Sequence, residues 1–593
     1  MVAIVLVAAT VCGGCAAGVT PPAPATPTTT GAPTPSPTPA VSPFRAAGPG
    51  APAVVVDVSD PVQAALTTSR TLYSVAPVVV LAASDDTAAQ LTAASAAVAL
   101  GAPLLLTPPA ATGTPVGPAD PALTAELVRL HAKAVLVVGR TAAPQGLVAV
   151  RVPDGADTAA LALATDHRLG PATPVPAGAE AAAVSALARP APAVLSPAAP
   201  ATAPPGPSGT ASPSAVPPVP DRLLLGTPEP QPTSPVLPRT VPPVAVPGTV
   251  ALTGAGPVPL AVLATVRAAG LAVIDAPAAD PRATSSVVQA IARAKPTHVV
   301  ALGAGFGPAD RLAERVAAAA TGVELPGGGQ LYFPQDEALP GKRYVALYGS
   351  PGMPALGVLG EQDVPATIAR AQAHAAPYRA LTGDTVVAGV EIIATIASAG
   401  AGPDGNYSQE RPIADLLPLV QAAGAAGMTV VLDLQPGRTD FLTQAQEYEP
   451  LLELPYVSLA LDPEWRLGPT QVHLQQIGHV GIDEVNAVAA WLAQLVRDHH
   501  LPQKALVLHE FALSMVTDRD RLDTSHDELA MVVHVDGQGN QPAKAATWNA
   551  IRLGAPAGIH WGWKNFYHED TPAMLDPAGT YAIQPTPDLV TYQ

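Results

Sequence analysis

A regular alternation of apolar runs and alanine-rich stretches between residues 78 and 140 is the feature that most constrains the fold of this chain. The segment begins VVVLAASDDTAAQLTAASAAVALGAPLLLTP, continues through a short loop, and ends LTAELVRLHAKAVLVVGR. Continuous apolar runs are typical of strands that are buried on both faces of a parallel sheet, and helices then link one strand to the next. The order strand, helix, strand, helix, strand therefore predicts a small parallel α/β unit.

Two such units are expected before a change in composition at about residue 329. The first covers residues 52–188, with strands at 54–58, 78–82, 103–107, 134–138 and 147–152. The second covers residues 248–328 and repeats the same order of elements, either as a degenerate copy or as a related flavodoxin-like half. Its two Gly-rich turns do not complete a G-x-G-x-x-G fingerprint, so we interpret them as tight turns. The proline-rich residues 189–247 between the units are predicted to be a linker.

The segments LGAPLLLTP and ELVRLHAKAVLVVGR resemble the cell wall-binding repeat 2 family, in which a similar strand and helix–strand pair close each repeat. The resemblance implies a secreted bacterial protein at the cell surface. Its expected partner is cell-wall polysaccharide or peptidoglycan.

The first residues have the layout of a lipoprotein signal. Residues 2–11 are apolar but too few to span a bilayer, and Cys12-Gly13-Gly14-Cys15 follows. We expect residues 1–15 to be a signal peptide, Cys15 to carry lipid, and the Pro/Thr-rich residues 16–51 to be an extended tether. An ordinary cleaved signal with incidental cysteines is the alternative. The whole arrangement resembles actinobacterial surface lipoproteins, which implies a location on the outer face of the membrane or in the cell wall.

Charge and cysteine content exclude several classes of function. The net charge of −17 argues against nucleic acid as a partner and provides no polybasic membrane patch, so a lipid would be the only membrane attachment. The chain has two cysteines, and cleavage before Cys15 would leave one, which permits neither a disulfide nor a zinc site built from cysteines.

Residues 329–593 are predicted to form a (β/α)8 barrel of the TIM type. Seven apolar strands are expected at 344–349, 386–395, 429–434, 457–461, 505–509, 530–535 and 558–563. Helices are expected at 364–381, 413–425, 439–452, 483–500 and 544–553. The eighth strand is placed either at 330–333 or near the C-terminus. The predicted fold class is therefore α/β, with one or two small parallel-sheet, flavodoxin-like domains before the barrel.

Acidic, amide and aromatic residues follow almost every barrel strand, at the rim where barrel active sites are built. Four carboxylates are candidate catalytic residues, namely Asp433, Asp462, Glu464 and Glu510. The candidate substrate-binding residues are Glu391, Gln435, Arg438, Trp465, His509, Asp536, Trp561, Trp563, Lys564 and Asp570.

Asp462 and Glu464 are two positions apart, so in a strand they share one face, with Cα atoms about 7 Å apart. Paired carboxylates catalyse glycoside hydrolysis. This D-x-E, together with Trp561 and Trp563, resembles chitinase-type barrels, which implies a glycan-acting enzyme. Pro463 interrupts the strand between the two acids. The alternative is that the acids form structural ion pairs with Arg438 or Arg466.

No cofactor or metal site is predicted. His509-Glu510 is not part of an H-E-x-x-H motif, and His534 and Asp536 offer two ligands without a visible third. Neither a G-x-S-x-G elbow nor a P-loop is present. Two functions stay open: a glycan-acting enzyme held at the wall, or a non-catalytic surface protein that binds the cell wall or carbohydrate. A lipid-anchored solute-binding protein is disfavoured because it needs two hinged lobes.

Overall fold

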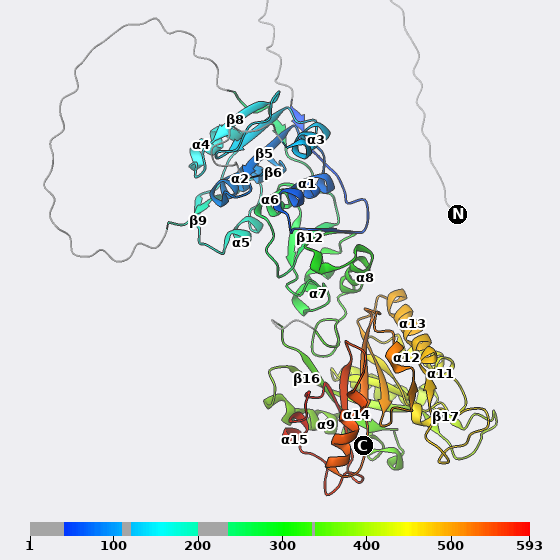
Figure 1. The fold of residues 1–593 in the computed structure, drawn as a ribbon. Helices are drawn as coiled ribbons and strands as arrows, with labels where there is room; N and C mark the ends of the chain where they lie inside the picture. The colour runs from blue at the N-terminus through cyan, green and yellow to red at the C-terminus, as the bar shows by residue number, and fades with distance from the viewer. Residues whose placement is uncertain (1–40, 109–119, 200–234, 335–338) are drawn as a thin grey trace, which may run out of the picture. The chain divides into compact units, whose positions relative to one another are not determined.

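The structure is a computed structural model that describes residues 41–108, 120–199, 235–334 and 339–593 (Figure 1). The predicted signal peptide, Cys15, and parts of the predicted tether and linker lie outside these residues. Within the described ranges, no helix combines the length and the apolar character needed to cross a membrane.

The repeat-like segment forms a parallel sheet with the strand order β6-β5-β7-β8. Its strands are β5 (Val78–Ala83), β6 (Leu104–Thr107), β7 (Ala134–Val138) and β8 (Val148–Val152). The helix α2 (Thr87–Leu100) follows β5, and α3 (Pro121–Arg129) precedes β7. Asp86 begins α2 by accepting a hydrogen bond from the Ala89 N–H at 2.8 Å. The small side chains of α2 are buried along nearly its whole length, because it lies between this sheet and α6 (Leu260–Ala268).

A second parallel sheet has the order β13-β12-β14-β3. Three of its strands come from the predicted second unit, and they are β12 (Thr249–Thr253), β13 (Ala272–Asp275) and β14 (His298–Leu302). The fourth strand, β3 (Ala53–Val56), was expected in the first unit but pairs with β14. From β3 in the second sheet, the chain therefore passes through α1 (Pro61–Leu72), builds the first sheet and then returns to the second. Buried residues of both sheets share one apolar core.

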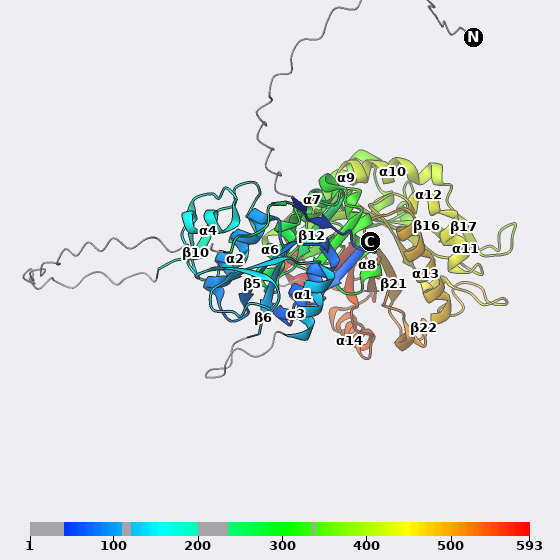
Figure 2. The same ribbon diagram turned by 90° about the horizontal axis from the view of Figure 1, so that it is seen from above.

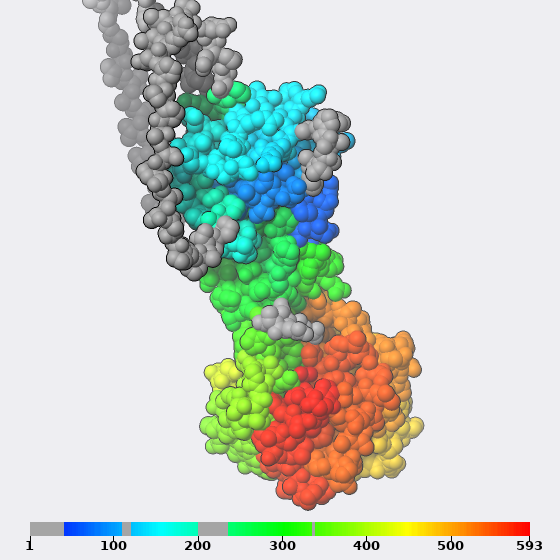
Figure 3. Space-filling view, turned by 60° about the vertical axis from the view of Figure 1, so that its left-hand side comes forward, coloured from blue at the N-terminus to red at the C-terminus, as the bar shows by residue number. Residues whose placement is uncertain are grey.

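The third part is a closed barrel of parallel strands, which confirms the predicted fold class. Its strands in order are β15 (Lys342–Gly349), β16 (Thr385–Ala397), β18 (Thr429–Leu434), β19 (Val457–Leu461), β21 (Lys504–Glu510), β23 (Leu529–Val535), β24 (His560–Asn565) and β25 (Leu589–Tyr592). The strand β25 pairs with both β24 and β15 and so closes the barrel. The eighth strand thus lies near the C-terminus, and residues 330–333 form no strand. On the surface, the last residues of the chain lie beside those of the first barrel elements (Figure 3).

Helices surround the barrel on its outer side (Figure 2). They are α9 (Val364–Ala375), α10 (Ile413–Ala425), α11 (Phe441–Glu447), α12 (Glu449–Leu452), α13 (Ile482–Asp498), α14 (Gln541–Arg552) and α15 (Pro577–Tyr581). Between β21 and β23 the described chain forms the short strand β22 (Val516–Thr517) and a single 3-10 turn where an α-helix is usual. This segment therefore departs from regular β/α alternation.

The interior of the barrel is apolar at one end and polar at the other. Side chains two positions apart in a strand point to the same face. Val431, Ala460, Val507 and Val532 pack together inside the barrel near the N-terminal ends of their strands. Two positions further along each strand come Asp433, Asp462, His509 and His534, and all four are buried. The upper, C-terminal end of the barrel is therefore filled with ionisable groups.

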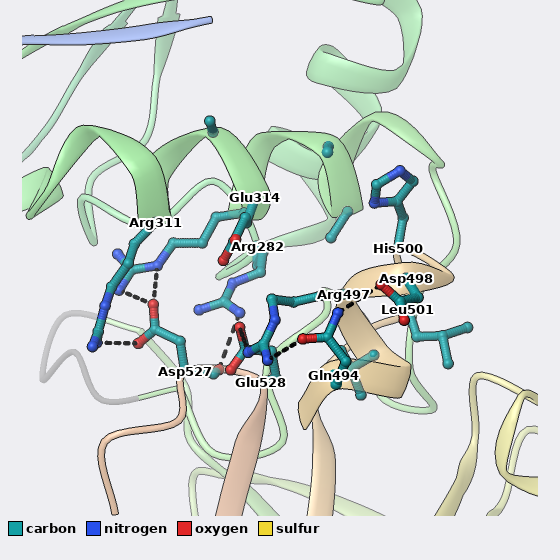
Figure 4. A pocket seen from close by; sticks show the side chains of 15 residues that line it. Arg282, Arg311, Glu314, Gln494, Arg497, Asp498, His500, Leu501, Asp527 and Glu528 are labelled. Carbon is teal, nitrogen blue, oxygen red and sulfur yellow. Dashed lines mark hydrogen bonds and ion pairs between the residues drawn. The ribbon is translucent and has the colours of Figure 1, made fainter. Parts of the chain in front are cut away.

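A network of ion pairs connects α8 (Ala309–Ala320) and the loop before α7 (Ser285–Ala294) to the N-terminal end of β23 (Figure 4). Arg282 donates to the Asp280 carboxylate at 2.9 Å and to the Asp527 carbonyl at 3.1 Å. Arg315 also pairs with Asp527. Arg282, Arg315 and Asp527 line part of a cavity of about 480 Å³. Since Arg282 and Arg315 already have carboxylate partners, the network is structural.

A buried ion pair fixes α14 against β24 and provides a stability test. The Lys544 ammonium lies 2.6 Å from the Asp570 carboxylate and 2.7 Å from the Lys564 carbonyl, with both side chains buried. Replacing Lys544 with Met leaves Asp570 buried without a counter-charge, so the free energy of unfolding should fall by about 3–5 kcal/mol in urea titrations. Arg521→Met removes the exposed pair with Asp483 and should cost less than about 1 kcal/mol. Equal losses in the two variants would contradict this role for Lys544.

Candidate functional site

His509, which ends the inward-facing row of β21, is the centre of the polar cluster. Its Nε2 lies 2.7 Å from a Glu391 oxygen and 3.9 Å from Asp433, and its Nδ1 lies 3.1 Å from Asp536. Burial lowers the pKa of His509, but the charges of Glu391 and Asp433 and the hydrogen bond that His509 donates to Asp536 outweigh burial and hold the pKa well above its usual value. At neutral pH the imidazolium therefore donates from both nitrogens and links acids that come from three different strands.

Tyr348 at the end of β15 orients Asp433. The Tyr348 hydroxyl donates to an Asp433 oxygen at 2.7 Å, and the Lys564 ammonium lies 3.5 Å from the centre of the Tyr348 ring. Burial raises the pKa of Asp433 to about 6, although the His509 cation lowers it. Gln435 donates weakly to the same hydroxyl at 3.5 Å, and its carbonyl accepts from the Ala397 N–H. The predicted residues Asp433, Gln435 and Lys564 thus meet around Tyr348.

Asp462 and Glu464 lie on a 3-10 turn and not in a strand. The strand β19 ends at Leu461, because Pro463 has no N–H for the ladder and fixes its own φ. The expectation that both acids share one face of a strand is therefore wrong. Asp462 is buried, and one of its oxygens has no hydrogen-bond partner among the described residues, while Glu464 is partly exposed. Gly478 packs on this turn so closely that a Cβ there would lie 2.4 Å from the Glu464 carbonyl oxygen.

The two arginines offered as ion-pair partners for these acids are bound elsewhere. Arg438 donates to the Gln471 carbonyl at 2.9 Å and covers the Tyr407 ring. Arg466 pairs with Glu484 at 3.0 Å. The structural ion-pair alternative is therefore not observed for Asp462 or Glu464.

Both acids of the turn are shifted toward their protonated forms. Burial raises the pKa of Asp462 well above its usual value, and the charges of Glu464 and Asp433 add to the effect. Burial and the nearby Asp536 raise the pKa of Glu464 to about 7, although Lys564 opposes this. A carboxyl group that keeps its proton near neutral pH and is partly exposed can serve as a general acid.

His534 is a neutral histidine beside this cluster. Burial lowers its pKa well below the usual value, and the His509 cation lowers it further. Its Nε2 lies 3.1 Å from the Thr591 hydroxyl, while Nδ1 has no hydrogen-bond partner in the part of the chain that the structure describes. Gly562 gives the ring its space, since a Cβ at Gly562 would lie 2.2 Å from the His534 Cδ2. Tyr348 and Thr591 were not among the predicted site residues, and His534 was considered only as one of two ligands without a third, although alternation along β15 and β23 places Tyr348 and His534 inside the barrel.

Four predicted residues point away from this cluster. Glu510 faces the outer side of β21 and pairs with Arg519 at 2.9 Å. Trp561 and Trp563 pack against Trp548 of α14, with ring centres 6.0 and 5.6 Å from it. Asp570 is the partner of Lys544. These four residues stabilise the barrel wall and do not line its interior.

Trp465 and Arg438 lie at the rim, next to the Asp462 turn. The Trp465 ring packs against His473 with ring centres 5.3 Å apart, and His473 in turn contacts Tyr407 at 6.2 Å. All three rings are partly exposed. This aromatic group comes from the loops that follow β16 and β19.

Two overlapping groups in the cluster have the composition of metal ligands. One contains Glu391, Asp433 and His509, and the other contains His509, His534 and Asp536. In each group, one ligand atom from each of the three residues lies within 4.8 Å of the other two. His509 is thus the third ligand that the spacing of His534 and Asp536 left undefined.

Comparisons with known proteins give little further information. No family model matches the chain, and no curated protein matches it. Among solved structures, Cwp6 from Clostridium difficile aligns with a TM-score of 0.31 and 12% sequence identity. The alignment covers 65% of this chain and 62% of that chain, so this chain spans less than two thirds of its length. A TM-score this low does not establish a shared fold.

The raised pKa of Glu464 predicts a stability difference that depends on pH. The folded pKa of about 7 exceeds the unfolded value of about 4.5, so the stabilisation is complete below pH 4.5 and is lost as the pH rises through 7. Glu464→Gln should therefore raise the free energy of unfolding at pH 8 by on the order of 2 kcal/mol and change it little at pH 4. Urea unfolding at both pH values measures this, with the exposed Glu453→Gln as control. A variant no more stable than the wild type at pH 8 would contradict the assigned burial of the acid.

Proposed function

We propose that the barrel is a glycan-acting hydrolase, with Glu464 as its general acid. The observation that carries the proposal is the Asp462–Glu464 turn at the C-terminal end of the barrel, whose acids have raised pKa values and, among the described residues, no cationic hydrogen-bond partner. Strand ends of this kind are where barrel enzymes place their catalytic groups. Two carboxyl groups in different protonation states are what glycoside hydrolysis requires.

In the proposed reaction, Glu464 donates its proton to the glycosidic oxygen as the bond from that oxygen to the anomeric carbon breaks. The Asp433 carboxylate, held by the Tyr348 hydroxyl, stabilises the positive charge that develops on the sugar. A water molecule adds its hydroxide to the anomeric carbon, and its remaining proton restores the Glu464 acid. Burial and the charge of Asp536 keep the pKa of Glu464 high, and the charge of Glu464 in turn raises the pKa of Asp462.

The aromatic group at the rim supports a sugar as the substrate. Trp465, His473 and Tyr407 are partly exposed next to Glu464, and aromatic faces suit the C–H surfaces of sugar rings. The same group also favours a second candidate function, in which the barrel binds a glycan without cleaving it. The location that we propose is the cell envelope, supported by the repeat-like segment and the lipoprotein-like leader.

Hydrolysis is tested by reducing-sugar release from purified wall polysaccharide and peptidoglycan. We expect Glu464→Gln to lower kcat by about 10²–10⁴-fold, the usual contribution of a general acid. Activity of the wild type should decline above about pH 7, where Glu464 loses its proton. Glu453→Gln, an exposed acid on a different face, should keep full activity.

The same variant separates the two candidate functions. Glu464→Gln should retain binding to the polysaccharide in pull-down assays, because the aromatic group at the rim is unchanged. Binding by both proteins without sugar release by either would remove the hydrolase and leave the binding module. Equal release by both would remove Glu464 as the acid.

The proposed lipid anchor is tested at Cys15. Cys15→Ser should abolish incorporation of labelled palmitate and move the protein from the membrane fraction to the medium, because no other thiol follows it in the chain. Cys12→Ser should remain labelled and membrane-bound. Membrane retention of the unlabelled Cys15 variant would exclude the lipid as the anchor.

A further inference from the structure

We infer that His509, His534 and Asp536 form a binding site for a first-row transition-metal dication of the Zn²⁺ type. One ligand atom from each residue lies within 4.8 Å of the other two, and all three side chains are buried at the C-terminal end of the barrel. The inference does not depend on glycan hydrolysis, because it concerns a different set of side chains and predicts a binding event.

His534 provides the observation that points to a ligand. Its side chain is fully buried, and its Nδ1 has no hydrogen-bond partner within the described part of the chain. A buried acceptor without a partner costs about 1–3 kcal/mol. The other ring nitrogen, Nε2, lies 3.1 Å from the Thr591 hydroxyl, and the ring packs edge-on against that of His509 with ring centres 4.8 Å apart. A cation at Nδ1 would satisfy this atom.

His509 is oriented in the way that metal-binding histidines usually are. Its Nε2 donates to the Glu391 carboxylate at 2.7 Å, and its Nδ1 faces Asp536 at 3.1 Å. In metal sites, a ligating histidine donates its second N–H to a carboxylate or a carbonyl, which fixes the ring and increases its basicity. Glu391 fills that position here. A bound dication would replace the proton that His509 shares with Asp536.

Asp536 completes the set with a carboxylate. One of its oxygens faces His509, and the other has no hydrogen-bond partner within the described residues. Two histidines and one acid leave coordination positions open, which is the pattern of catalytic zinc sites and not of closed structural ones. Imidazole ligands select transition metals over Mg²⁺ and Ca²⁺, which prefer oxygen ligands.

The charge around the site favours a cation. Glu391, Asp433, Asp462 and Asp536 are all buried in the upper half of the barrel. The nearest fixed cation on the strands is Lys564, and its ammonium lies over the Tyr348 ring. Asp462 keeps its proton, so the three other acids face one lysine and the protonated His509 in an environment of low dielectric constant, where unbalanced charge is costly. A dication would compensate two of the acids.

The test is a calorimetric titration of the full chain with Zn²⁺, using Cys12→Ser/Cys15→Ser as the background to remove the only two thiols. We expect saturation at one Zn²⁺ per chain, and no binding of Mg²⁺ at the same concentrations. His534→Gln and Asp536→Asn should each weaken Zn²⁺ binding by more than about 100-fold, and Glu391→Gln by about 10–100-fold. His499→Gln, an exposed histidine on the surface, should bind as the background does.

Anomalous diffraction at the zinc edge locates the ion without any substitution. Anomalous density between His509, His534 and Asp536 would support the inference, and density elsewhere would overturn it, as would the absence of saturable Zn²⁺ binding by the background protein. Circular dichroism verifies the fold of each variant. Sugar release without Zn²⁺ binding would remove this inference alone, whereas Zn²⁺ binding without sugar release would remove the proposed hydrolase alone.

Discussion

Closure of the barrel by β25 determines the character of the site. This strand pairs with β24 on one side and with β15 on the other, so every strand has two neighbours and no edge remains open. In a closed sheet, every second side chain of every strand must point to one shared axis. Apolar residues satisfy that requirement at the N-terminal end. At the C-terminal end the same geometry forces acids and histidines from separate strands into one buried volume.

The electrostatics of the site follow from this crowding. Glu391, Asp433, Asp462 and Asp536 are buried together at the C-terminal end of the barrel. Four buried carboxylates cannot all stay ionised in an environment of low dielectric constant with so few cations. The excess of negative charge is reduced in two places. On the side of the 3-10 turn, Asp462 and Glu464 take up protons. On the side of β23, His509 carries the positive charge between Glu391 and Asp536.

The parts of the fold that local patterns specify were predictable, and those that depend on distant partners were not. The bounds of β7, β18 and β19 agree with the predicted strands, because continuous apolar runs mark strands buried on both faces. The partner of β3 lies 246 positions away in the sequence, from Ala53 to Val299, and no local pattern encodes it. In the site, position at a strand end identified Glu391, Asp433, His509, Asp536 and Lys564 as neighbours. It did not specify which side of the barrel wall a residue faces. Trp563 and Lys564 are adjacent in β24, so one of them must point outward, and Trp563 does, into the packing around α14.

His509 connects the surroundings of the proposed acid pair, Asp462 and Glu464, with the inferred metal site. Its Nε2 faces Asp433, which lies beside the proposed acid pair. Its Nδ1 contacts Asp536. A dication on the Nδ1 side would remove the imidazolium proton but keep a positive charge nearby, so Glu391 and Asp433 would still face a cation. Asp462 and Glu464 would then experience a similar electrostatic potential whether His509 binds a proton or a metal ion. For this reason the proposed acid chemistry of Glu464 and the inferred metal site are compatible within one barrel, and each can be present without the other.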